Sequence, residues 1–263
     1  VTSVCPATMT IAKDELLNVM KNVLLKVLGI LLFTPYTASA GERPDARWIT
    51  SSESGVDLPN SWIAFRRDVE LKALPTTAPV CIAADTKYWL WINGECVVFE
   101  GGLKRGPTPG DTYYDRVDVA PFLRKGTNRI AVLLWHFGKD GFSHKDSGRA
   151  GLLFSVVGKH FSLQSDSLWL CRVHPAFGNT GEPHPNFRLA ESNIRFDARR
   201  DIGAWQTADQ SDLDGFRNAR EIGRWGDAPW GDLVERPIPQ WKDFGEREAR
   251  FERFSAGEAG SVV

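Results

Sequence analysis

Short runs of alternating or continuous apolar residues, separated by Gly, Pro, Asn and Asp, occupy the chain from residue 60 to about residue 170. This pattern is typical of an all-β sandwich. We expect strands over 61–71, 78–92, 95–99, 113–123, 129–137, 151–157 and 162–173. Neither a βαβ alternation nor a sustained helical period occurs after residue 40, and parallel α/β folds are therefore disfavoured.

Two features set the expected order of the central strands. Asn93-Gly94 predicts a type I′ hairpin turn, because both central residues of that turn need a positive φ. In such a hairpin Ile92 faces Glu95 and Trp91 faces Cys96. The run 129–137, RIAVLLWHF, is apolar on both faces, which indicates a central strand.

The segment 78–92 alternates with period two, and its two faces differ in character. One face is expected to enter the sandwich core and carries Val80, Ile82, Ala84, Thr86, Tyr88, Leu90 and Ile92. The opposite face carries Cys81, Ala83, Asp85, Lys87, Trp89 and Trp91. The two indoles share their face with a carboxylate and an ammonium group. They are therefore either covered by a loop or a neighbouring domain, or they form a platform on which sugar rings stack.

Charge excludes some classes of partner. The 32 Lys and Arg residues nearly balance the 33 Asp and Glu residues, for a net charge of -1. A nucleic-acid-binding protein normally carries a basic patch, and a membrane-surface helix is basic and amphipathic; neither is evident here. We expect no nucleic-acid partner and, after removal of the N-terminal segment described next, no membrane partner.

The N-terminal region has the three zones of a secretory signal peptide. Met20 and Lys21 open a short basic zone, and the apolar run 27–33 that follows is too short to span a bilayer. Ala38-Ser39-Ala40 has the small-x-small form of a cleavage site. Residues 20–40 are accordingly predicted to be a helical signal peptide that exports the chain to the periplasm, the cell surface or the medium; a buried N-terminal helix is the alternative. Residues 1–19 are interpreted as an over-extended gene start, with Met9 as an alternative start.

Cysteine chemistry adds little to the sequence picture. Cys5 precedes the signal peptide, which leaves Cys81, Cys96 and Cys171 in the exported part. An odd number leaves at least one thiol without a partner within the chain. Cys81 is expected to lie roughly 33 Å from Cys96 along an unbroken strand, too far for a disulfide. We expect buried thiols.

Several motifs occur in one order along the chain: ARWIT (46–50), FRRDVEL (65–71), IAADTKYWLWING (82–94), YYDRVDVAPFLRKGTNRIAVLLWH (113–136), SDSLW (165–169) and RFDARRDIGAW (195–205). That order resembles the N-terminal β-sandwich module of bacterial α-L-rhamnosidases. The resemblance extends over roughly residues 44 to 245 and implies a jelly-roll sandwich of galactose-binding-like type. It also identifies ERPIP (235–239) as similar to the lead-in to a following β-domain. The expected domains are then a module over 41–232 and, over 233–263, a linker with the truncated start of that next domain.

What the resemblance implies about chemistry is limited. The family's catalytic acid and base lie in an (α/α)6 barrel C-terminal to its β-domains, and no such barrel occurs in this sequence. No catalytic residue is therefore assigned. The family also implies a calcium ion in some carbohydrate-binding modules, but no Asp-x-Asp-x-Asp ligand run is present to support one.

Glycoside hydrolysis needs two carboxyl groups at a set separation across the bond. The carboxylates available on strands or strand ends are Asp85, Asp115, Asp118, Glu191 and Asp197. For Asp115 and Asp118 a structural role, accepting backbone N–H bonds at turns, is favoured. Asp197 is better interpreted as an ion-pair partner of Arg199 and Arg200.

Two polar loops, 101–111 and 138–150, are expected at one rim of the sandwich, where binding loops cluster. His136, His144, Asp140 and Asp146 suggest a zinc site, but they lack the spacing of known zinc motifs, and we predict no metal. The cationic and imidazole donors of the two loops are suited either to sugar hydroxyls or to packing against a catalytic domain, and docking is favoured. These are Lys104, Arg105, His136, His144 and Lys145.

The favoured function is a non-catalytic accessory module of an exported α-L-rhamnosidase-like glycoside hydrolase, which supports or docks the missing barrel. The alternatives are a free-standing carbohydrate-binding module for rhamnose-containing glycans and a structural sandwich that binds protein.

Overall fold

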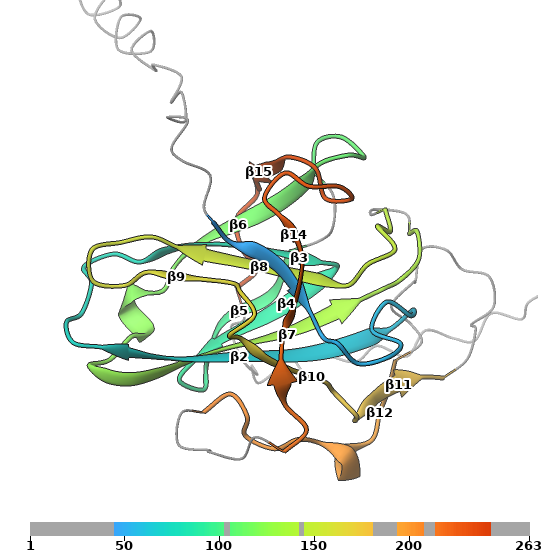
Figure 1. Ribbon diagram of the computed structural model, residues 1–263, viewed down its shortest axis with the longest axis horizontal. Coiled ribbons are helices and arrows are strands. Elements are labelled where there is room, and N and C mark those ends of the chain that lie inside the picture. Colours follow the sequence, from blue (N-terminus) through green and yellow to red (C-terminus); the bar gives the residue numbers. More distant parts are fainter. Residues whose placement is uncertain (1–44, 103–105, 142–144, 181–193, 208–213, 243–263) are drawn as a thin grey trace, which may run out of the picture. The chain divides into compact units, whose positions relative to one another are not determined.

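The computed structural model describes residues 45–102, 106–141, 145–180, 194–207 and 214–242 (Figure 1). The strands in these ranges are β1 (Arg47–Thr50), β2 (Ser61–Leu71), β3 (Pro79–Asp85), β4 (Lys87–Ile92), β5 (Glu95–Gly102), β6 (Thr112–Asp118), β7 (Gly126–His136), β8 (Gly151–Val156), β9 (Leu163–Gln164), β10 (Leu170–Val173), β11 (Phe177–Asn179), β12 (Ile194–Phe196), β13 (Arg217–Asn218), β14 (Arg220–Arg224) and β15 (Leu233–Glu235). Short 3-10 helices occur at η1 (Ala120–Phe122) and η3 (Ala198–Arg200). Within these ranges, no helix is long and apolar enough to span a membrane. The predicted signal peptide, residues 20–40, and the preceding residues 1–19 lie outside them.

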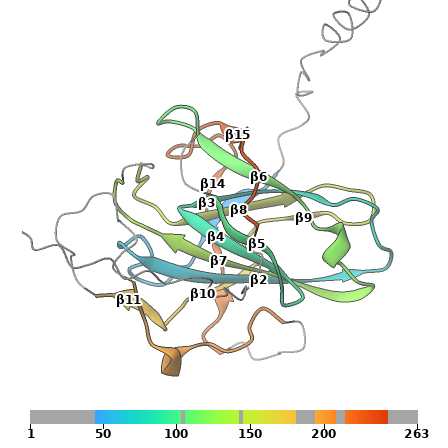
Figure 2. The same ribbon diagram turned by 180° about the vertical axis from the view of Figure 1, so that it is seen from behind.

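Two layers of strands build the sandwich, as the sequence predicts (Figures 1 and 2). One sheet has the order β14-β1-β8-β3-β6-β15, with β9 paired to β8. The other has the order β13-β10-β2-β7-β4-β5, and β11 pairs with β12 in a small separate sheet. The strand pairs are antiparallel, except that β15 runs parallel to β6.

The core lies between the two sheets, because each strand sends alternate side chains inward. Removing each large aliphatic side chain from water contributes about 1.5–3 kcal/mol. The fully buried members of this core include Ile49, Ile63, Phe65, Val80, Ile82, Tyr88, Leu90, Ile92, Ile130, Val132, Leu134, Leu152, Phe154, Trp169 and Cys171. Both sheets also bury side chains on their outer faces, which makes two smaller clusters described below.

The segment 78–92 differs from the prediction of one continuous strand. It divides at Asp85-Thr86, and its halves belong to different sheets: β3 lies between β8 and β6, whereas β4 lies between β7 and β5. The inward face is nevertheless the predicted one, because period-two alternation continues in register across the break. Six of its predicted members are buried in the core: Val80, Ile82, Ala84, Tyr88, Leu90 and Ile92.

The hairpin and the central strand are confirmed. Asn93 and Gly94 both have positive φ, 55° and 87°, and Trp91 pairs with Cys96. Strand β7 lies between β2 and β4 and is buried along both faces from Asn128 to its end.

At the C-terminal end the sheet includes residues that the sequence analysis placed in a linker. Leu233–Glu235 pairs with Thr112–Tyr114, and the next residue, Arg236, reaches the buried Asp115 carboxylate. The chain therefore leaves the module later than residue 232.

The three described cysteines form no disulfide. Cys171 is buried as expected, and burial raises the pKa of its thiol to about 12. Cys81 is half-buried, and its pKa is raised by burial. The expectation of burial is wrong for Cys96, which is exposed because it lies two residues past the hairpin turn.

Candidate functional site

Aromatic side chains gather on the outer face of the six-stranded sheet. Trp62 on β2 and Trp135 on β7 stack with ring centroids 4.6 Å apart, and Phe177 on β11 stacks on Trp62 at 4.0 Å. The segment from β11 to β13 supplies Trp205 and Phe216 to the same cluster. The described residues between β11 and β13 therefore cover part of this face.

Trp89 and Trp91 are half-buried members of this aromatic cluster. Trp91 meets the edge of Trp205, with centroids 5.9 Å apart, so a loop of the same chain covers it in part. Trp89 stacks on Trp62 at 5.5 Å and meets the edge of Phe99, which is 45% exposed. The Trp89–Phe99 corner is thus the most open aromatic surface of the predicted platform.

A hollow of about 580 Å³ opens beside the same face. It is lined by Arg172, Pro175, Arg200, Asp201, Ile202, Gly203, Asp214 and Phe216. Guanidinium donors and carboxylate acceptors at one apolar wall are the groups that a sugar's hydroxyls and ring can use. Asp201 lies 3.4 Å from His174 Nε2; burial lowers the pKa of His174, and Asp201 only partly offsets that effect.

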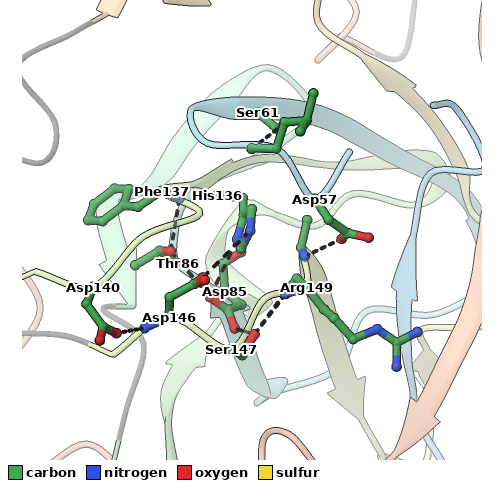
Figure 3. A network of polar contacts seen from close by, with 12 residues as sticks. Asp57, Ser61, Asp85, Thr86, His136, Phe137, Asp140, Asp146, Ser147 and Arg149 are labelled. Carbon is green, nitrogen blue, oxygen red and sulfur yellow. Dashed lines mark hydrogen bonds and ion pairs between the residues drawn. The ribbon is translucent and has the colours of Figure 1, made fainter. Parts of the chain in front are cut away.

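A second group of polar side chains is buried where β3 passes into β4 (Figure 3). Asp85 and His136 are both fully buried. The Asp85 carboxylate accepts hydrogen bonds from Trp230 Nε1 at 3.1 Å and from the Ser147 hydroxyl. These hydrogen bonds offset part of the free-energy cost of removing the carboxylate from water.

His136 sits between two carboxylates. Its Nδ1 lies 3.7 Å from Asp85 Oδ1 and 3.3 Å from the Asp85 carbonyl, and its Nε2 lies 3.8 Å from Asp146 Oδ1. Burial alone lowers the pKa of His136, but Asp85 and Asp146 outweigh it, and the pKa is raised. His136 therefore lies between Asp85 at the end of β3 and Asp146 in the segment before β8.

Among the described residues, Asp85, His136 and Asp146 are the group that can hold a metal ion, with one ligand atom from each within 4.8 Å of the others. Asp85 already accepts an indole N–H and a hydroxyl, whereas His136 Nε2 is buried without a hydrogen-bond partner among the described residues. Of the four residues considered for zinc, Asp140 binds Lys145 and the backbone N–H of Asp146, and His144 lies outside the described residues.

The other predicted sugar donors have different outcomes. His136 is wrong as a surface donor, because β7 ends inside the sandwich and the side chain has no exposed area. Lys145 is 57% exposed and pairs with Asp140 at 2.9 Å. Lys104, Arg105 and His144 lie outside the described residues. The sequence analysis missed Asp85 as the partner of His136; its only signal was a charged residue inside an apolar strand.

The carboxylates considered for acid–base catalysis have structural partners. Asp118 accepts from the backbone N–H groups of Ala78 and Ala120 at 2.7 and 3.1 Å, which confirms the role predicted for it. Asp197 pairs with Arg199 at 2.8 Å, also as predicted.

Asp115 is likewise a structural carboxylate. It accepts from the backbone N–H of Gly102 at 2.8 Å and from the Tyr88 hydroxyl at 2.6 Å. The role predicted for it is confirmed. Glu191 is outside the described residues, and Asp85 is fully buried.

No protein-family model and no curated protein matches the chain. Solved structures do. The chain is similar to the GH78 family rhamnosidase of Bacillus sp. GL1, with 30% identity over 76% of this chain and 20% of that one, at a TM-score of 0.66. It is also similar to an α-L-rhamnosidase from Dictyoglumus thermophilum, with 23% identity over 74% of this chain and 22% of that one, at a TM-score of 0.55.

A further match is an α-L-rhamnosidase from Aspergillus terreus, with 22% identity over 68% of this chain and 21% of that one, at a TM-score of 0.52. At the identities of the last two, the likeness shows the fold alone. The chain spans about a fifth of the length of these enzymes. The predicted resemblance to a module of α-L-rhamnosidases is confirmed.

Proposed function

We propose that this chain is a non-catalytic accessory module of an α-L-rhamnosidase-like glycoside hydrolase, whose role is to support and dock the catalytic barrel. The observation that carries the proposal is its similarity, at 30% identity, to one fifth of a GH78 family rhamnosidase. The carboxylates of the described sandwich that were candidates for catalysis are committed to capping, ion pairing or the core, which agrees with a supporting role.

The segment that leaves the sandwich has the character of an interface. Ile238 and Trp241 follow β15 with exposed fractions of 61% and 71%, and Val234 on β15 is 37% exposed. Large apolar side chains on a surface commonly mark a contact with another protein surface. Arg236, anchored on Asp115, fixes the point from which this segment departs.

The test of the non-catalytic part is hydrolysis of an aryl α-L-rhamnoside by the purified chain. We expect no turnover above the buffer rate, while the full Bacillus sp. GL1 enzyme in a parallel assay hydrolyses the substrate. Turnover that scales with the concentration of the chain contradicts the proposal.

Docking is tested by exchanging the matching segment of the Bacillus sp. GL1 enzyme for this chain. The exchanged enzyme is expected to retain rhamnosidase activity and to lose thermal stability when Ile238 and Trp241 are both changed to Ser. The control is Leu74→Ser, an apolar residue 48% exposed on the β2–β3 connection. Equal losses for the control and the double variant argue against this surface as the interface.

Glycan binding is a second candidate function, favoured by the open Trp89–Phe99 corner and by the hollow lined by Arg172 and Asp201. Calorimetric titration with L-rhamnose and rhamnose-containing oligosaccharides tests it. We expect millimolar binding that Trp89→Ala weakens and that Trp241→Ala leaves unchanged. Silence across the panel at millimolar concentration contradicts this candidate.

Export is part of the proposal, and the zones of residues 20–40 support it. Expression in a secreting bacterial host, followed by mass spectrometry of the mature N-terminus, tests it. The expected first residue is Gly41; a product that retains residues 20–40 contradicts export.

A further inference from the structure

Four arginines converge on an open groove of about 480 Å³ beside the edge of the seven-stranded sheet. Arg220 and Arg224 come from the edge strand β14, and Arg47 comes from β1 next to it. Arg149 comes from the segment before β8. Two acidic residues, Glu221 and Asp227, also line the groove. Guanidinium groups therefore outnumber carboxylates two to one, in a chain whose net charge is only -1.

The two carboxylates of the groove offset only part of its positive charge. Asp227 accepts from the backbone N–H of Arg224 at 2.7 Å, which is a turn contact. Glu221 accepts from the backbone N–H of Ser167 at 3.1 Å and lies 3.7 Å from the Arg47 guanidinium.

The four arginines of the groove differ in whether a carboxylate pairs with them. Arg47 is paired with Asp45 at 2.8 Å. Within the part of the chain that the structure describes, no ion pair is formed by the side chains of Arg220, Arg224 or Arg149. The groove therefore presents three uncompensated guanidinium groups to solvent.

Protection of the edge strand explains only two of these arginines. Cations on an edge strand discourage pairing with other chains, and Arg220 and Arg224 on β14 suffice for that role. Arg149 comes from another part of the chain, and its guanidinium lies 5.9 Å from the ring centre of the buried Trp230. Figure 3 shows its side chain pointing away from the Asp85–His136 cluster. Contact with an indole face positions a guanidinium before any ligand arrives.

Repulsion between two arginines on paired strands is a second reason to expect a bound anion in the groove. Arg47 and Arg224 are direct partners in the β1–β14 ladder, and like charges directly opposite each other destabilise a strand pair. Asp45, at 80% exposed, offsets this only weakly in water. A bound anion that bridges the guanidinium groups removes the repulsion.

We propose that this groove binds a carboxylate-bearing sugar chain, with uronate carboxylates held by Arg220, Arg224 and Arg149. The guanidinium fork matches a carboxylate in plane with two parallel N–H···O bonds. An open groove, unlike a closed pocket, admits an extended chain. The choice of a sugar over other anions rests on the proposed link to a glycoside hydrolase; the groove itself is separate from the aromatic corner and hollow on the other sheet.

The experiment is calorimetry of the whole chain with polygalacturonate at 50 mM salt. The matched control ligand is the same polymer with its carboxylates methyl-esterified. We expect binding to polygalacturonate and at least a tenfold weaker response to the ester. Because the contacts are ionic, affinity should also fall steeply between 50 and 200 mM salt, by analogy with the linear log–log dependence for other polyanions.

Variants locate the site. Arg220→Gln combined with Arg224→Gln is expected to lower the affinity at least tenfold, and both side chains are exposed, so the fold is retained. Lys72→Gln combined with Lys125→Gln removes the same charge from two exposed positions that line neither the groove nor the hollow, and is expected to change affinity less than twofold. Circular dichroism of each variant checks folding.

Equal binding of the esterified polymer, or equal losses for the two double variants, overturns the proposal. Equally tight binding of duplex DNA at the same salt also overturns it, because the groove would then accept any polyanion. If the chain does not bind polygalacturonate but still binds neutral rhamnose glycans, this proposal fails and the second candidate function stands. If it binds no glycan at all, both are refuted.

Discussion

The buried carboxylate Asp115 is expected to determine how firmly the chain's exit segment is held. It joins Tyr88 in the core, the backbone of Gly102 and the guanidinium of Arg236. The side chains of Asp115 and Arg236 are 1% and 6% exposed, so solvent screens their interaction little. Asp115→Asn keeps the shape of the side chain and removes its charge.

The expected cost follows from the burial of the partner. Removing one member of a buried ion pair leaves the other charge uncompensated and costs about 3–5 kcal/mol. For a domain of this size each kcal/mol lowers the melting temperature by about 2–4 °C, so the variant should melt about 6–20 °C lower. Burial and Asp115 also raise the pKa of Tyr88 well above its ordinary value, so its hydroxyl remains a donor throughout the accessible pH range.

The assay is urea unfolding followed by Trp fluorescence, with thermal melting as a second measurement. Arg116→Gln is the control, because Arg116 pairs with Glu235 at 3.5 Å between the same two strands, with both side chains about half exposed. An exposed pair of this kind contributes at most about 1 kcal/mol. If Asp115→Asn costs no more than Arg116→Gln, the buried contact does not hold β15 to the sandwich and the reasoning is refuted.

The remaining predictions concern the loop anchor, the aromatic cover and the thiols. Burial lowers the pKa of His136, but its two carboxylate neighbours outweigh burial and raise the pKa above the ordinary value of 6.5. The protonated side chain therefore stabilises the fold fully below about pH 6.5, and this contribution is lost as pH rises through the folded-state pKa. The urea midpoint of the parent should therefore fall between pH 6 and pH 9 more than that of His136→Gln, and parallel pH profiles contradict this. Trp62→Ala should cost about 3–5 kcal/mol in urea unfolding, because it removes an indole stacked on three rings, and a loss below 1 kcal/mol contradicts the stacked cover. Disulfide-exchange labelling followed by peptide mapping should modify Cys96 first and Cys171 only on unfolding, since burial raises the pKa of Cys171 to about 12; simultaneous labelling contradicts the burial.

Local pattern predicted much of the sandwich. The strand over 61–71, the Asn93-Gly94 hairpin with its register, and the central position of 129–137 are all found in the structure. These features depend on the geometry of one strand or one turn: the side-chain period of two, the positive φ of a type I′ turn and the burial of both faces of a central strand.

The candidate sites were less predictable. Trp89 and Trp91 were correctly placed on the outer face, but the sequence left open what covers them. Trp91 meets Trp205, from more than a hundred residues later, whereas Trp89 stacks on Trp62 and meets the partly exposed Phe99. Arg149 and Arg224 give no joint signal in the sequence, because they lie in separate polar segments that the β1–β14 edge brings together.

The sequence by itself determined which side of segment 78–92 faces the core, even across the break at Asp85, because alternation is a property of the local backbone. The tertiary structure alone decided which sheet each half of 78–92 joins and which partner each buried charge receives. His136 illustrates the difference. Its strand was evident from neighbouring residues, but its buried position between Asp85 and Asp146 depends on residues that long-range packing brings to the end of β7. Charges inside a protein are satisfied by whichever groups long-range packing delivers, and a local pattern contains no record of them.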